Sequence, residues 1–106
     1  MMRKRAKRLP ADARKKQILE NAVAMSRKLG YKFITRTKIA NKIGVTSSNL
    51  VHHFARMGAL RTAVLKYAIE HEILDILAQG LVNKESIILK MDSQLRDKVI
   101  TYLTNL

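Results

Sequence analysis

The chain has 106 residues, a net charge of +13 and no cysteine, which limits it to one domain and excludes disulfides and thiolate metal sites. The charge is uneven, because residues 1–67 hold 17 Lys/Arg against two acidic residues, whereas residues 68–106 hold four against six. This excess of positive charge indicates a polyanionic partner rather than a small substrate. The sequence contains neither 18 consecutive apolar residues nor a signal-peptide pattern, so we expect a cytoplasmic protein with no membrane partner.

Residues 1–9 are strongly basic and contain almost nothing that could pack, so we expect a flexible arm. Its functional interpretation is that Arg3, Lys4 and Arg5 contact nucleic-acid phosphates or enter a minor groove. The plain alternative is a solubilising tail, and composition alone leaves both open.

The stretch from Pro10 to Leu29 predicts one helix, because proline suits a helix start and the apolar residues that follow recur at helical intervals. Gly30 is expected to end this helix. A short extended link comes next, in which we expect Phe33 and Ile34 to hold the loop against the core.

Residues 35–54 contain two short helical patterns that meet at Gly44. Glycine tolerates the positive φ that a sharp bend requires, and Thr46 can cap the second helix with its side-chain oxygen. The inward faces of the two patterns consist of Ile39, Ala40, Ile43, Leu50, Val51 and Phe54. This layout predicts a helix-turn-helix whose second helix could enter a major groove.

Small and amide-bearing side chains open the second of these helices, as base reading in a groove would require. The residues expected to contact bases are Ser47, Ser48, Asn49 and His52. Asn49 on an adenine is the leading candidate, although these residues could also be the polar start of an ordinary surface helix. The residues expected to contact phosphates are Arg3, Lys4, Arg5, Thr35, Arg36, Thr37, Lys38, Thr46, His53 and Arg56.

Residues 59–79 predict one long helix whose apolar residues nearly encircle it in two stripes. A three-helix head can cover only one stripe, so the other must be buried by the C-terminal segment, a second chain, or both. Helical spacing returns beyond Gly80, and Asp92 with Ser93 leaves open whether residues 84–106 form one helix or two. These helices are too few to enclose a small-molecule pocket, so we expect dimerisation through Ile73, Leu77, Ile88, Leu95, Val99 and Tyr102.

Several short motifs follow one another along residues 14–68. They are Ile18, Leu19 and Ala22, then Leu29, Gly30 and Tyr31, then Thr35, Thr37, Ile39 and Ala40, then Gly44, Val45 and Thr46, and finally His53, Phe54 and Leu60. In this combination the segment resembles the DNA-binding domain of TetR-type transcriptional regulators. The resemblance implies an all-α fold and regulation of transcription by DNA binding.

The chain also departs from that family. Ser48 stands where the family usually has glycine, Val51 where it has tyrosine, and Met57 where a lysine contacts a phosphate. Our hypothesis is that Arg56 and the N-terminal arm compensate for these losses. Members normally add a long inducer-binding domain, whereas residues 69–106 are too short for one, so no small-molecule inducer is expected.

Signals for catalysis or metal binding are weak. His52 and His53 are adjacent, so on a helix they diverge by about 100° and cannot chelate one ion. Residues 71–75 resemble a zinc-protease signature, but an aspartate replaces the second histidine. We therefore expect no metal, no cofactor and no enzymatic activity.

We accordingly predict an all-α protein with a flexible arm (residues 1–9), a three-helix DNA-binding head (10–56) and a helical dimerisation region (57–106). Its expected function is that of a homodimeric, sequence-specific repressor on a palindromic operator, in a bacterial nucleoid and, by analogy, in a plasmid or phage circuit. The two recognition helices should lie roughly 34 Å, or a little more, apart. Two alternatives stay open: an architectural or nucleoid protein with little sequence preference, and a protein-interaction module that sequesters an acidic partner.

Overall fold

The computed structural model describes residues 9–106, and within that range the chain forms seven α-helices and one 3-10 turn without any β-strand. The elements are α1 (Ala11–Leu29), η1 (Tyr31–Phe33), α2 (Arg36–Ile43), α3 (Ser47–His53), α4 (Met57–Glu70), α5 (Leu74–Val82), α6 (Ser86–Leu89) and α7 (Ser93–Thr104). The predicted all-α class is confirmed. The arm, with Arg3, Lys4 and Arg5, lies outside the described residues.

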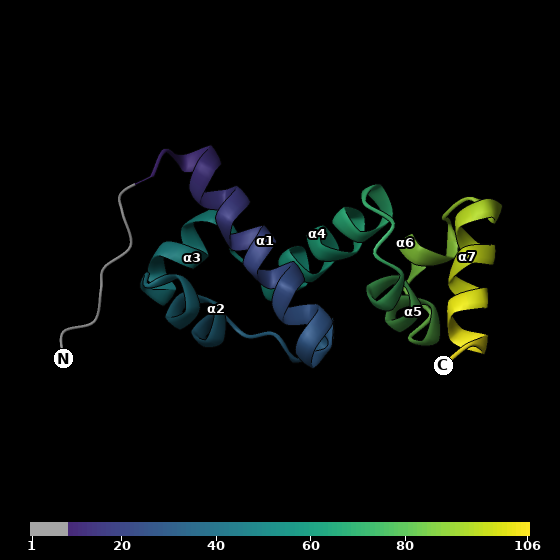
Figure 1. Ribbon diagram of the computed structural model, residues 1–106. Helices are drawn as coiled ribbons and strands as arrows, with labels where there is room; N and C mark the ends of the chain where they lie inside the picture. Colours follow the sequence, from purple (N-terminus) through teal and green to yellow (C-terminus); the bar gives the residue numbers. More distant parts are fainter. Residues whose placement is uncertain (1–8) are drawn as a thin grey trace.

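The helices are arranged along an elongated molecule that measures 46 × 26 × 19 Å. Figure 1 shows α2 and α3 beside α1 at one end, α4 in the middle, and α5, α6 and α7 at the other end. We call residues 9–56 the head and residues 57–106 the tail. The helix α1 begins directly after Pro10 and ends at Gly30, as expected from the sequence.

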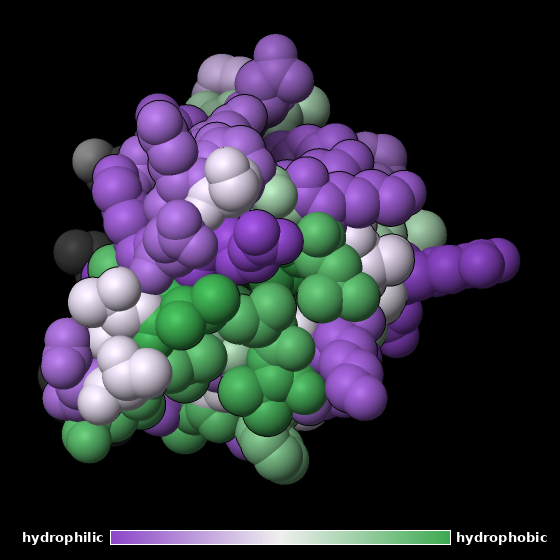
Figure 2. All heavy atoms as spheres, turned by 90° about the vertical axis from the view of Figure 1, so that its right-hand side faces the viewer, coloured by the Kyte–Doolittle hydropathy of each residue, from purple (hydrophilic) through white to green (hydrophobic). Residues whose placement is uncertain are grey.

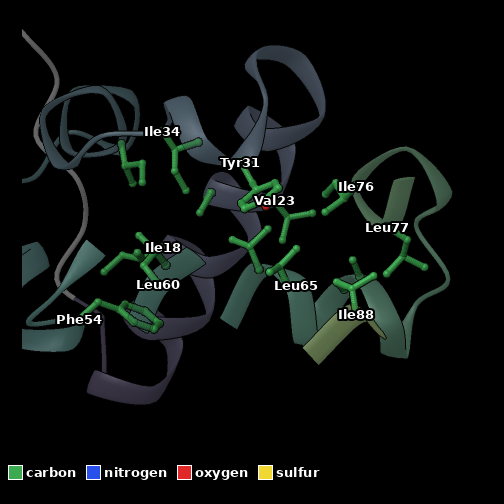
Figure 3. Packing of buried hydrophobic residues seen from close by; sticks show 14 of the residues in the cluster. Ile18, Val23, Tyr31, Ile34, Phe54, Leu60, Leu65, Ile76, Leu77 and Ile88 are labelled. Atoms are coloured by element: carbon green, nitrogen blue, oxygen red, sulfur yellow. The ribbon is translucent and has the colours of Figure 1, made fainter. Parts of the chain in front are cut away.

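One hydrophobic cluster runs through both parts (Figure 3). Ile18 and Leu60 pack together near the head end, and the cluster continues through Tyr31 to Leu77 and Ile88 in the tail. Because the head and the tail share this core, their relative position is set by packing.

Polar contacts add to the packing between head and tail. The backbone N–H of Tyr31 donates to Gln79 Oε1 at 2.9 Å, and Gln79 Nε2 donates to the carbonyl of Ser26 at 3.2 Å. The Tyr31 hydroxyl donates to Glu85 Oε2 at 2.8 Å, and Arg27 pairs with Asp75 at 3.0 Å. The end of α1 is thereby bound to α5 and to the turn before α6.

The prediction of one long helix over residues 59–79 is wrong, because α4 ends at Glu70 and α5 begins at Leu74. Between them Glu72 adopts a left-handed conformation with φ 50°, and the chain turns back on itself. A continuous helix would have left its second apolar stripe in water. The break instead buries Ile76 and Leu77 completely in the core.

In the tail the segment after α5 forms two helices, α6 and α7. Asp92 separates them, since its Oδ1 accepts a hydrogen bond from the N–H of Leu95 at 2.9 Å and caps α7. No helix within residues 9–106 combines the length and the apolar character needed to span a membrane.

Burial corrects part of the dimerisation prediction. Four of the six residues assigned to a dimer interface are buried in the core of this single chain: Leu77, Ile88, Leu95 and Val99. Their apolar character is explained by packing of the chain's own helices, so they offer no surface to a partner. Ile73 and Tyr102 are only partly buried, and their role in a dimer stays a prediction.

The link between α1 and α2 was predicted to bury both Phe33 and Ile34. Ile34 is fully buried, but Phe33 is 67% exposed. The reason is geometric: η1 brings Tyr31 into the core, and the side chain two residues later is directed away from it.

Candidate nucleic-acid interface

Local hydrogen bonds define the ends of α2 and α3. The Oγ1 atom of Thr35 accepts from the N–H of Lys38 at 3.2 Å and caps α2. Thr46 caps α3 in the same way, accepting from the N–H of Asn49 at 3.1 Å. Both helices are short, so they depend on these caps to satisfy their first N–H groups.

Gly44 makes the bend between the two helices. It has φ 76° and ψ 31°, in the left-handed region that glycine adopts without strain. Its N–H and that of Val45 both donate to the carbonyl of Ala40, at 2.9 and 3.0 Å. The turn expected at this position is therefore present with the expected chemistry.

The α2–α3 pair is anchored to the rest of the molecule by its inner side. Ile39 and Leu50 are fully buried, and Ala40 and Phe54 are also in the core. Burial of this side fixes the rotation of α3 about its axis. The side that remains in solvent we call the outer face of α3; it consists of Ser47, Ser48, Asn49, Val51 and His52.

Two features of the outer face bear on base reading. The carboxamide of Asn49 is exposed and makes no hydrogen bond to any described residue, so all its donors and acceptors face solvent. Val51 was predicted to point inward but is 39% exposed, because the core already holds Leu50 and Phe54 on either side of it.

The C-terminal end of α3 lies beside the first turns of α1, as Figure 1 shows. The Lys15 ammonium is 5.2 Å from the ring centroid of Phe54. Burial, the neighbouring His52, Arg14 and Lys15 together lower the pKa of His53. Burial is the largest cause of this shift towards neutral His53, and the nearby positive charges add to it; a bound polyanion would offset the contribution of those charges.

Two of the residues predicted to contact phosphates also brace the loops of the head. Arg36 Nη2 donates to the carbonyl of Ala55 at 2.8 Å, and Lys38 Nζ donates to the carbonyl of Phe33 at 3.4 Å. Arg36 therefore holds the segment that follows α3. The side chains of Thr37 and Arg56 are exposed.

The described head and the start of α4, residues 9–67, carry 12 Lys/Arg against Asp12 and Glu20. Sequence reasoning missed Arg14 and Lys15 as neighbours of α3. The signal available was the basic run Arg14-Lys15-Lys16 in the first turns of α1, but helical periodicity does not tell which other helix such a run will face.

The site shows no arrangement for metal binding. Among residues 9–106 no group of three His, Cys, Asp or Glu side chains is placed to hold an ion. The rings of His52 and His53 lie 5.2 Å apart and nearly perpendicular, at 81°.

Comparison with known proteins found no match to this chain among family models, curated proteins or solved structures.

Proposed function

We propose that the chain is a sequence-specific double-stranded DNA-binding protein that regulates transcription, with the α2–α3 pair acting as a helix-turn-helix. The observation that carries this proposal is the outer face of α3. Its polar side chains are exposed, the Asn49 carboxamide makes no hydrogen bond within residues 9–106, and the opposite side of the helix is fixed in the core. A reading helix needs all three properties.

The dimensions of α3 suit a major groove. An α-helix is about 10–12 Å across with its side chains, and the major groove of B-DNA is about 12 Å wide, so the seven-residue α3 can lie in it. Ser47 and Ser48 at its N-terminal end are small enough to let the backbone approach the base edges. Asn49 could then bind N6 and N7 of an adenine with its amide.

Charge supports the same assignment. The exposed cations of the head come from three separate places: Lys15 on α1, Lys38 on α2 and Arg56, which directly precedes α4. Exposed cations distributed in this way can contact phosphates on both sides of a groove. The N-terminal ends of α2 and α3 add partial positive charge.

We further propose, on the resemblance to TetR-type regulators, that the protein acts as a homodimer on a palindromic operator and represses transcription. Two-fold pairing of the chain would present two copies of α3 to two equivalent half-sites.

The test is selection of bound duplexes from a random pool, followed by affinity measurements on variants. Asn49→Ala should lose discrimination at one base pair of each half-site, at a cost of about 1 to 3 kcal/mol on the preferred sequence. Asn41→Ala, which removes another exposed asparagine from the head, serves as the matched control and should keep the full sequence preference.

Three other results would contradict the proposed function. Equal weakening on all sequences by Asn49→Ala would contradict base reading. A pool that yields no common motif, with tight binding to random DNA, would indicate an architectural protein. Loss of duplex binding at moderate salt would favour an acidic protein partner.

A further inference from the structure

Val51 is the apolar member of the outer face of α3, and it is 39% exposed, whereas the other members of that face are polar. Several other exposed apolar side chains belong to the tail: Val82, Leu89, Ile100 and Leu106. Figure 2 looks onto that end of the molecule and shows hydrophobic side chains gathered in one area bordered by polar ones. Val51 lies at the opposite end, on α3 (Figure 1). Its exposure therefore concerns the face to which the proposed function assigns base reading.

The neighbours of Val51 along α3 leave its two methyl groups accessible. Residues three and four positions earlier lie on the same side of a helix, and here they are Ser48 and Ser47, whose side chains are too short to cover a valine. Phe54, three positions later, is 8% exposed and belongs to the core. Within α3, no long side chain shares the side of the helix on which Val51 lies.

The direction of the Val51 side chain is fixed as well. Burial of Leu50 and Phe54 sets the rotation of α3 about its axis. The branched Cβ of a valine in a helix leaves one strongly preferred χ1 rotamer, so the methyl groups keep one orientation. A side chain that is ordered beforehand loses little conformational entropy when a partner covers it.

The major groove of DNA offers one apolar group to such a side chain. Thymine carries a methyl group at C5 that projects into the groove, and the remaining base edges present hydrogen-bond donors and acceptors. A valine side chain can form no hydrogen bond with those edges or with a phosphate. Contact with a thymine methyl group is therefore the favourable interaction that it can make in the groove.

We propose that Val51 contacts the C5-methyl group of a thymine and selects that base in the bound sequence. Two residues along an α-helix are turned by about 200°, so Val51 and Asn49 lie at opposite edges of the outer face. The thymine therefore belongs to a different base pair from the adenine assigned to Asn49. This inference rests on the proposed function, to whose sequence preference it adds a second, apolar determinant.

The test uses the duplex recovered by selection from a random pool, with each thymine replaced in turn by deoxyuridine. Uracil lacks the methyl group and keeps the hydrogen-bonding groups of thymine, so the replacement isolates the apolar contact. At one position of the recovered motif, uracil should weaken binding of the wild-type chain about fourfold, which is the effect of one buried methyl group. Fluorescence anisotropy of the labelled duplex measures this affinity.

Three variants assign the effect to a residue. Val51→Ala removes both methyl groups of an exposed side chain, so circular dichroism should show an unchanged fold. It should bind the thymine duplex about four- to fifteenfold more weakly, and it should no longer distinguish thymine from uracil at the responsive position. Asn49→Ala should keep that distinction while it loses discrimination at its own base pair. Val82→Ala, which removes an exposed valine from the tail, is the matched control and should keep both the affinity and the response to uracil.

The outcomes separate this inference from the proposed function. A recovered motif in which no thymine responds to uracil contradicts the role of Val51 and leaves the DNA-binding function unaffected. A response to uracil that persists in Val51→Ala also overturns the inference, because the methyl group then acts through DNA shape or through another residue. A selection that yields no common motif contradicts sequence-specific binding itself, and this inference with it.

Discussion

Gly80→Ala tests whether α5 and α6 are as closely packed as the structure shows. Gly80 lies in α5, and a Cβ atom at this position would be 2.6 Å from Cγ1 of Ile88 and 3.4 Å from its Cβ and Cδ1. Ile88 is fully buried, so its side chain has no solvent to move into. The added methyl group must displace α6 or force Ile88 out of its rotamer.

The expected magnitude follows from two opposing effects. Carbon atoms pack best at about 3.5 to 4.0 Å, and relief of such a clash in a filled core costs about 1 to 3 kcal/mol. Replacing glycine by alanine within a helix stabilises the helix by about 1 kcal/mol. We therefore expect Gly80→Ala to lower the free energy of unfolding by about 1 kcal/mol, or up to about 2.

Gly58→Ala is the matched control, because Gly58 is an exposed helical glycine in α4 whose added Cβ would meet no atom within 4 Å. It should raise the free energy of unfolding by up to about 1 kcal/mol. Urea unfolding followed by circular dichroism measures both variants. If Gly80→Ala proves as stable as Gly58→Ala, the close contact with Ile88 does not exist.

Three further predictions concern the tyrosine that links head and tail, the cap of α3 and the histidine at its end. Burial and the hydrogen bond to Glu85 raise the pKa of Tyr31 to about 12. The contribution of the neutral Tyr31 hydroxyl to the free energy of unfolding should therefore be complete below pH 10 and disappear as the pH rises through 12. Tyr31→Phe should abolish this loss of stability at alkaline pH. Thr46→Ala should cost about 1 kcal/mol of stability in urea unfolding, whereas Thr46→Ser should keep the cap and cost little. The pKa of His53 lies below its ordinary value of 6.5, so this histidine gains its positive charge only at acidic pH. Duplex affinity should therefore rise as the pH falls below 6.5. If His53→Gln shows the same rise, another group causes it.

The sequence predicted best those features that depend on one residue and its immediate neighbours. The cap at Thr46 and the left-handed turn at Gly44 need only a side-chain oxygen or a missing Cβ at the right position. The order of the helices along the head could be predicted from the sequence for the same reason. The polar outer face of α3 followed once two apolar neighbours, Leu50 and Phe54, were taken as buried.

The break between α4 and α5 could not be read from the sequence, because residues 71–73 include no glycine or proline. The turn at Glu72 is unfavourable locally and is compensated by burial of Ile76 and Leu77, which are fully enclosed only when α5 folds back. An apolar pattern that encircles a helix was the available signal. It indicated that more surface needed burial, without indicating that the helix itself would divide.

The same limit explains the misassigned dimer residues. Helical spacing in α7 identified Leu95 and Val99 as one apolar face, and both are buried. Spacing cannot tell whether the chain's own helices or a second chain covers such a face. The residues left exposed, Phe33 and Val82 among them, lie outside the regular pattern, because one belongs to a link and the other to the last turn of α5.

The link between head and tail combines hydrogen bonds with a shared core. The bonds from Tyr31 to Gln79 and Glu85, at 2.9 and 2.8 Å, join the end of α1 to α5 and to the turn before α6, within a core that continues through both parts. Each such bond contributes about 0.5 to 1.5 kcal/mol. Tyr31→Phe with Gln79→Ala should therefore lower the free energy of unfolding in urea by about 1 to 3 kcal/mol. An unchanged free energy of unfolding would mean that core packing alone joins the head to the tail.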